Sequence, residues 1–282
     1  MKNTILKFLP LLLVIGLASC FDYETQFDGP YSDEENNTGF KLPKKVVYVA
    51  GGNVYLANEF AKDSIRIDNS ATVDVASINN DHTNVLFKRT GENINIYNIE
   101  SESITGQVPN TETAIWFDYH ANNETIYFLL SNNLLDTYGP EVLTNRPIDL
   151  RTLGSVTGNV KGVAVMNNGE FVFSKISAIG NSEYLIKSDG INILKQFTTT
   201  FFHKNFRLNK GENWLWIGDT FDDGLYYYRM PEVSKYDDQF DYFIGAPTNS
   251  GFGYRVTQDN KIRNSIWETI QSPGGQITSI DH

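Results

Sequence analysis

The feature that most constrains the fold is a polar turn that recurs along the chain at nearly constant spacing. In each copy an extended run leads into a turn rich in Asn, Asp and Gly, and an apolar strand follows. The turns begin at Asn79, Asn122, Asn167 and Asn209, at intervals of 43, 45 and 42 residues. Such spacing indicates a repeat architecture, in which each unit buries its apolar face against the next.

The repeated unit holds more strands than one hairpin. The clear copies are VASINNDHTNVLF (75–87), FDYHANNETIYF (117–128), VAVMNNGEFVF (163–173) and FRLNKGENWLW (206–216). A weaker fifth copy, YRVTQDNKI, spans 254–262, and its Asp259 lies 50 residues after Asn209. Asn, Asp and Gly suit these turns because they tolerate a left-handed backbone. A second hairpin follows within the unit, as in RTGENINIY (89–97). We therefore expect four strands in each unit.

A unit of roughly 40–45 residues with four strands has the length of a propeller blade. Over about residues 45–282, the rhythm of turn and apolar strand resembles that of TolB-like and WD-repeat propellers. The resemblance implies an all-β, β-propeller fold. The Trp-Asp dipeptide and the Ser-Pro-Asp-Gly turn of those families are missing, so no family's function is implied. A β-sandwich, the alternative, would not need near-equal periods.

The two ends of the repeat region predict how the ring closes. Residues 46–50, 53–57 and 64–68 supply only three strands before the first full copy. The last residues, QITSIDH (276–282), resemble DVASINN (74–80). Because an open sheet edge is a liability, we expect the C-terminal strand to complete the N-terminal blade. This count predicts six blades, with a thin sixth over 252–275, and five blades plus an extra hairpin is the alternative.

The N-terminus has the features of an export signal. Lys2 and Lys7 are followed by the apolar run 8–18, which is too short to span a bilayer. We therefore interpret residues 1–19 as a secretory signal peptide that takes no part in the fold.

The chain has a single cysteine, Cys20, which lies directly after this signal. It has no partner for an internal disulfide. The sequence LASC (17–20) resembles the bacterial lipobox, which implies that Cys20 is acylated with diacylglycerol and becomes the first residue of the mature protein. Several buried acyl chains attach a protein firmly to a membrane. An ordinary signal peptide with an incidental cysteine is the alternative.

The segment 20–43 is acidic and rich in turn residues, so we expect a flexible tether between the anchor and a propeller domain over 44–282. Asp22 and Glu24 resemble the surface-export signal of some didermal bacteria. Residue 21 is Phe rather than Asp, so the inner-membrane retention signal is absent. The predicted location is the outer membrane, with surface exposure favoured over a periplasm-facing position.

The formal net charge of −11 argues against a nucleic-acid partner, because nucleic acids are bound through cationic patches. The expected partners are the membrane, through the lipid anchor, and an envelope protein or a glycan.

Few residues suggest chemistry. No two of the four histidines have metal-ligand spacing, and nucleophile elbow, P-loop and dinucleotide motifs are lacking, so we expect no metal and no cofactor. The acidic stretches 219–224 and 237–241 lack the spacing of a calcium loop and are interpreted as hairpin tips. Trp116 and His203 are the candidate ligand-binding residues, and core packing or solvation is the alternative for each.

These observations favour a non-catalytic binding or scaffolding module of the cell envelope. One alternative is a hydrolase or lyase with a site in the central pocket, for which the candidate side chains are Asp74, Asp118, Lys161, His203 and Arg255. A glycan-binding surface lipoprotein and a subunit of an outer-membrane transport or secretion assembly are the others. Fold alone does not choose among them.

Overall fold

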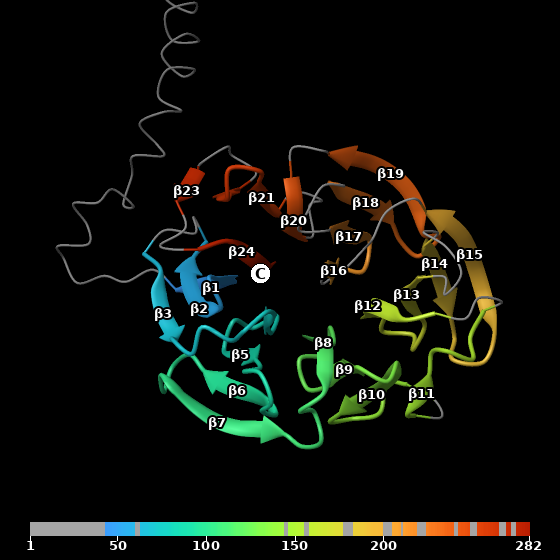
Figure 1. The fold of residues 1–282 in the computed structure, drawn as a ribbon, viewed down its shortest axis with the longest axis horizontal. Coiled ribbons are helices and arrows are strands. Elements are labelled where there is room, and N and C mark those ends of the chain that lie inside the picture. Colours follow the sequence, from blue (N-terminus) through green and yellow to red (C-terminus); the bar gives the residue numbers. More distant parts are fainter. Residues whose placement is uncertain are drawn as a thin grey trace, which may run out of the picture. The chain divides into compact units, whose positions relative to one another are not determined.

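The described strands form six four-stranded sheets that surround a common axis as the blades of a propeller (Figure 1). The computed structural model describes residues 43–59, 63–143, 146–154, 158–176, 183–199, 205–209, 211–218, 224–239, 242–248, 253–264, 269–271 and 275–282. Within these ranges, no helix has the length and apolar character needed to cross a membrane. The predicted all-β propeller with six blades is confirmed.

Each blade is an antiparallel meander whose strands follow one another from the axis outward. Blade one contains β24 (Ile277–Asp281), β1 (Lys44–Ala50), β2 (Asn53–Asn58) and β3 (Ile65–Asp68). Blade two contains β4 (Ala76–Ile78), β5 (Asn84–Phe87), β6 (Ile94–Asn98) and β7 (Ser103–Val108). Blade three contains β8 (Ala114–Tyr119), β9 (Ile126–Leu130), β10 (Leu134–Tyr138) and β11 (Ile148–Asp149).

The remaining blades follow in chain order. Blade four contains β12 (Val160–Val165), β13 (Phe171–Ile176), β14 (Glu183–Ser188) and β15 (Ile193–Thr199). Blade five contains β16 (Asn205–Leu208), β17 (Trp214–Gly218), β18 (Leu225–Arg229) and β19 (Ser234–Gln239). Blade six contains β20 (Tyr242–Pro247), β21 (Gly253–Thr257), β22 (Lys261–Arg263) and β23 (Thr269–Gln271).

The C-terminal strand closes the ring, as predicted. β24 is the innermost strand of blade one and pairs antiparallel with β1, with Val47 opposite Asp281 and Tyr48 opposite Ile280. The backbone N–H of Gly51 donates to the carbonyl of Gln276, which continues the ladder past the strand end. The first blade is therefore complete only when both ends of the propeller meet.

Both faces of the inner strands are buried, and β1 shows how its sequence allows this. Val46 and Tyr48 lie in an apolar cluster with Ile244 and Tyr254 of blade six. Val47 and Val49 point to the other face and belong to a cluster with residues of blade two. Successive side chains of a strand alternate between faces, so a continuous apolar run is what a strand between two blades requires.

The repeated turns share one geometry. In each, the fourth residue donates its backbone N–H to the carbonyl of the first residue, which is Asn79, His120, Met166 or Asn209. The fourth residue has a positive φ and is His82, Asn123, Gly169 or Glu212. Our expectation that Asn, Asp or Gly supplies the left-handed residue therefore holds in only two of these turns.

The turn asparagines act instead through their side chains. Asn79 Oδ1 accepts the backbone N–H groups of Thr83 and Asn84, both at 2.9 Å. Asn209 Oδ1 accepts those of Asn213 and Trp214 at 3.0 and 2.7 Å. These bonds satisfy backbone donors that a four-residue turn would leave unpaired.

The sixth blade departs from the expectation of a thin unit over 252–275. It has four strands and begins at Tyr242, ten residues before that range. The weak fifth copy, 254–262, spans β21 and β22, whereas the other copies span the first and second strands of their blades. This shift of one strand accounts for the long step to Asp259.

The turn geometry predicts the effect of Asn79→Ala. Asn79 is buried, and its loss leaves two backbone N–H groups without an acceptor, so we expect the free energy of unfolding to fall by about 1–3 kcal/mol. Urea unfolding measures this change. The control is Asn132→Ala, since exposed Asn132 accepts one N–H at 3.3 Å and its loss should cost less. Equal losses in the two variants would contradict this account of the turn.

Candidate functional site

A buried arginine joins the innermost strands of four blades. Arg207, on β16, places Nη1 2.9 Å from Asp118 Oδ2 on β8 and 3.7 Å from Asp281 Oδ2 on β24. Its Nη2 donates to the carbonyl of Ala76 at 2.6 Å, and its Nε donates to that of Ile280 at 3.1 Å. One side chain thus ties blade five to blades one, two and three.

Small polar side chains complete this axial network. Ser77 Oγ donates to Asp118 and lies 3.0 Å from Asp281 Oδ2, which also accepts the N–H of Ile78 at 2.9 Å. Ser279 Oγ lies 3.1 Å from Arg207 Nη2. The buried charges therefore have hydrogen-bonding partners on several sides, as charges away from water require.

Two carboxylates share one guanidinium in this network. Burial raises the pKa of Asp118 to about 6, a shift that Arg207 opposes and the charge of Asp281 reinforces. Burial alone would lower the pKa of Arg207, but Asp281 and Asp118 outweigh it and the pKa is raised. Arg207 therefore stays charged, and Asp118 can take up a proton in mildly acidic solution.

Trp116 lies beside the same network. The guanidinium carbon of Arg207 is 4.7 Å from the centroid of its ring, within the range of a cation–π contact. The side chain is 1% exposed. Trp116 is therefore packed in the core, which is the alternative that the sequence left open. A role in ligand binding stays untested, and His203 lies outside the described residues.

The other side chains considered for a catalytic pocket are dispersed. Asp118 belongs to the axial network, but Asp74 is exposed beside a pocket between blades two and three. Lys161 lies half-buried on β12, and Arg255 on β21 lies over aromatic rings of blades five and six. The described hydrogen bonds and ion pairs join none of these three side chains to Asp118.

The sequence analysis missed Arg207 and Asp281. A signal for Arg207 exists, because Ser77, Asp118 and Arg207 each stand two residues before the first residue of a repeat turn. Charged residues at equivalent places on innermost strands converge once the ring is closed. Comparing that single position across the copies would have paired Arg207 with Asp118 and Ser77, but it would not have found Asp281.

The turns themselves form contacts from blade to blade. The N–H of Asn80 donates to Asn123 Oδ1 at 2.8 Å, and the N–H of Asn167 donates to Glu212. His120 is buried, with Nε2 3.3 Å from the carbonyl oxygen of Met166. These contacts explain the polar turns by ring assembly rather than by ligand binding.

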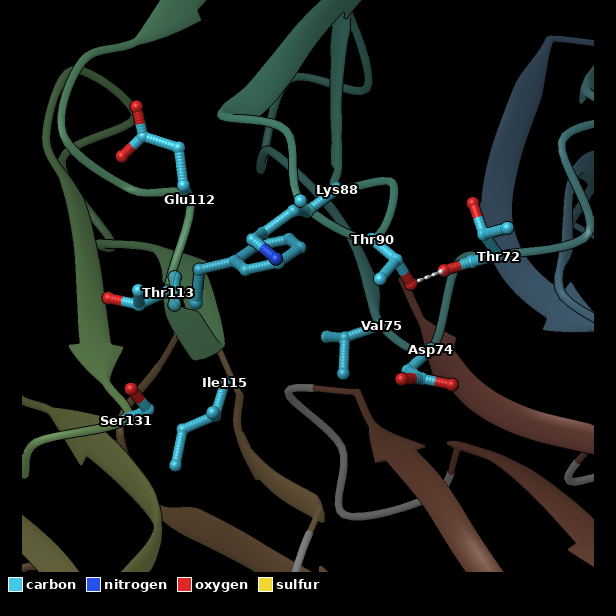
Figure 2. Close-up of a pocket in the computed structure, with 12 residues that line it drawn as sticks. Thr72, Asp74, Val75, Lys88, Thr90, Glu112, Thr113, Ile115 and Ser131 are labelled. Carbon is cyan, nitrogen blue, oxygen red and sulfur yellow. Dashed lines mark hydrogen bonds between the residues drawn. The ribbon is translucent and has the colours of Figure 1, made fainter.

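A pocket lies between blades two and three (Figure 2). It has a volume of about 380 Å³. The segments that lead into β4 and β8 line part of it. The residues that line it are Thr72, Asp74, Val75, Lys88, Thr90, Gly91, Glu112, Thr113, Ala114, Ile115, Phe117 and Ser131.

Charges of both signs meet in this pocket. Figure 2 shows Lys88 between Glu112 on one side and Asp74 on the other. Burial lowers the pKa of Lys88, and the carboxylates of Asp74 and Glu112 oppose that shift. Exposed Ile115 adds an apolar wall. The pocket can hold a ligand with hydroxyl and charged groups next to an apolar surface.

Metal binding finds no support in the part of the chain that the structure describes. No group of three or more His, Cys, Asp or Glu side chains there could hold a metal ion. Of the two acidic stretches, 219–223 lies outside the described residues. Residues 237–239 belong to strand β19, so our expectation of a hairpin tip there is wrong.

Comparisons with known proteins bear on the fold alone. No protein-family model matches the chain, and none of the curated proteins matches it. Among solved structures, hydrazine synthase of Kuenenia stuttgartiensis is similar, with a TM-score of 0.51, 10% identity, and coverage of 75% of this chain and 70% of that one. The Cps50 (Swd1) β-propeller domain of Myceliophteria thermophila gives a TM-score of 0.50, 11% identity, and coverage of 86% and 91%.

The axial network predicts a pH dependence that Asp118→Asn removes. Because the pKa of Asp118 is raised in the folded state, its proton stabilises that state at pH 4 and below, and this contribution is lost as pH rises through about 6. We expect the stability of the wild type relative to Asp118→Asn to fall between pH 4 and pH 7. Urea unfolding of both proteins across this range measures it.

Carboxylates outside the axial network titrate in both proteins and cancel in that difference, whereas Asp281 interacts with Asp118 and belongs to the effect that is measured. The pKa of Asp68 is lowered by hydrogen bonds from Ser70 and Arg89 that outweigh its burial, and the same holds in wild type and variant. A difference that stays constant, or that rises with pH, would contradict the raised pKa of Asp118.

Proposed function

We propose that this protein is a lipid-anchored, non-catalytic binding module of the cell envelope. In this proposal Cys20 carries the lipid that holds it on the outer membrane, with the propeller facing the surface rather than the periplasm. The pocket between blades two and three receives the ligand. The observation that carries the proposal is the contrast between a filled axis and this open pocket.

The axis offers little room at the level of Arg207. The Arg207 side chain is 2% exposed, and side chains or carbonyls of three other blades hold its guanidinium. Its donors bond to Asp118 and to two backbone carbonyl groups. Asp281 accepts hydrogen bonds from Ser77 and Ile78. A general acid, base or nucleophile needs a free group within reach of a substrate, and this network presents none. The alternative of a hydrolase or lyase with a central site is therefore disfavoured.

The side chains that line the pocket between blades two and three are suited to ligand recognition. The hydroxyl groups of Thr72, Thr90, Thr113 and Ser131 line it beside Lys88. Thr90 Oγ1 donates to the carbonyl of Thr72 at 3.1 Å, which fixes one hydroxyl of the wall (Figure 2). Hydroxyl and charged groups together suit a glycan or a polar loop of an envelope protein.

The anchor is tested by Cys20→Ala. The wild type should partition with membranes and into a detergent-rich phase, and the variant should lose both properties, because acyl chains supply the membrane affinity. Ser19→Ala is the control, since it changes the neighbouring residue and keeps the thiol. Protease treatment of intact cells then reports surface exposure. Membrane retention of Cys20→Ala would overturn the lipid anchor.

The pocket is tested by Lys88→Met, which keeps the length of the side chain and removes its charge. Full-length protein in mild detergent is used to recover envelope partners and to probe a glycan array. We expect binding to the ligand so identified to weaken about tenfold, equivalent to about 1.4 kcal/mol. Lys45→Met is the control, because Lys45 pairs with Glu59 on blade one. Unchanged binding by Lys88→Met would place recognition elsewhere on the propeller.

A further inference from the structure

The interface between blades five and six is richer in aromatic side chains than the mostly aliphatic clusters around blade one. Its buried cluster contains Trp216, Tyr227 and Tyr242, with Leu225 and a half-buried Trp214. Arg255 projects from β21 into these rings. Its guanidinium carbon lies 5.3, 5.6 and 5.4 Å from the ring centroids of Trp216, Tyr227 and Tyr242.

A second arginine stands directly opposite the first. Arg255 and Arg263 are cross-strand partners on β21 and β22, so their side chains project from the same face of blade six. Like charges in that relation repel each other and destabilise a sheet. Among the described residues, no ion pair joins either arginine to a carboxylate, whereas Arg89, Arg151 and Arg207 each have one.

Three buried donors in this region have no acceptor. The Nε atoms of Arg255 and Arg263 are shielded from solvent and make no hydrogen bond, and the same is true of Trp216 Nε1. Each of these atoms can donate but cannot accept. A buried donor without a partner is costly, so a cluster of donors indicates a missing acceptor.

We propose that this seam between blades five and six binds an oxyanion, meaning a carboxylate, sulfate or phosphate group. The planar guanidinium matches such groups with two parallel N–H donors. The surrounding rings limit access of water and strengthen the attraction. A bound oxyanion would also neutralise the repulsion between Arg255 and Arg263. The site is separate from the pocket between blades two and three, and it does not depend on that assignment.

Further cationic and aromatic side chains extend the seam toward solvent. Arg229 lies on the face of β18 that also carries Tyr227, two residues away. Its guanidinium carbon is 4.5 Å from the ring centroid of Tyr236, which is 58% exposed, and 5.5 Å from that of Trp214. An oxyanion carried on a larger molecule could therefore meet a second arginine outside the buried pair.

The test is a titration of the full chain in mild detergent, followed by tryptophan fluorescence, because Trp216 lies at the site. Sodium sulfate, sodium phosphate and glucuronate are added at constant ionic strength, with glucose as the neutral comparison. We expect saturable binding of at least one oxyanion and none of glucose. Sulfate or phosphate alone would identify a free inorganic ion, and glucuronate alone would identify an acidic sugar.

Single-residue variants test whether the fluorescence change arises at the seam between blades five and six. Arg255→Gln should weaken binding at least tenfold, and Arg151→Gln should leave it unchanged, because exposed Arg151 pairs with Asp149. Without added anion, Arg255→Gln should unfold at the same temperature as the wild type or higher, since a repulsion is removed. If it fails to fold, Arg263→Gln on the less enclosed strand takes its place. Equal binding by wild type and variant, or no saturable binding of any oxyanion, would overturn the proposal.

Discussion

The ion network around Arg207 is the contact on which the closed ring depends. It couples residues that are far apart in sequence, since Arg207 reaches Ala76, Asp118 and Ile280 at separations of 131, 89 and 73 residues. Ordering so distant a set has a large entropic cost, which the apolar surface between blades must offset. The network makes the apolar contact between blades specific to one register of the inner strands. A buried guanidinium that lost its carboxylates would be strongly unfavourable, so it penalises any register that fails to bring the inner strands together.

Ring closure and this network reinforce each other. β24 completes blade one through its ladder with β1, and the same strand carries Asp281 and Ser279 to the axis. Two neighbouring contacts hold it against blade two, where Asp281 accepts from Ile78 and Thr278 donates to the carbonyl of Asp74. The final strand therefore does more than cover an open edge. It delivers one of the two carboxylates that balance the central cation, so closure and charge neutralisation are one event.

The sequence was sufficient for the features that repeat and insufficient for those that need the closed ring. The spacing from Asn79 to Asn209 predicted the blades, and the likeness of the last strand to 74–80 predicted closure. The start of blade six was missed because the weak copy was placed on 254–262, which spans the second and third strands of that blade rather than its first and second. Arg207 was missed because its partners lie on other blades, and no local pattern links them. The left-handed His82 and Glu212 were missed because tertiary contacts, rather than residue preference, hold those turns.

The same pair of side chains, an arginine over a tryptophan, occurs twice and has different surroundings each time. Arg207 lies over Trp116 with carboxylates, carbonyls and hydroxyls around its donors, which accounts for it as a structural element. Arg255 lies over Trp216 with rings around it, another arginine opposite and no acceptor at Nε. In an acidic chain with a net charge of −11, carboxylates are plentiful, so their absence from the described surroundings of Arg255 is informative. The fold neutralises Arg207 with its own carboxylates. Arg255 is left for a bound oxyanion to neutralise.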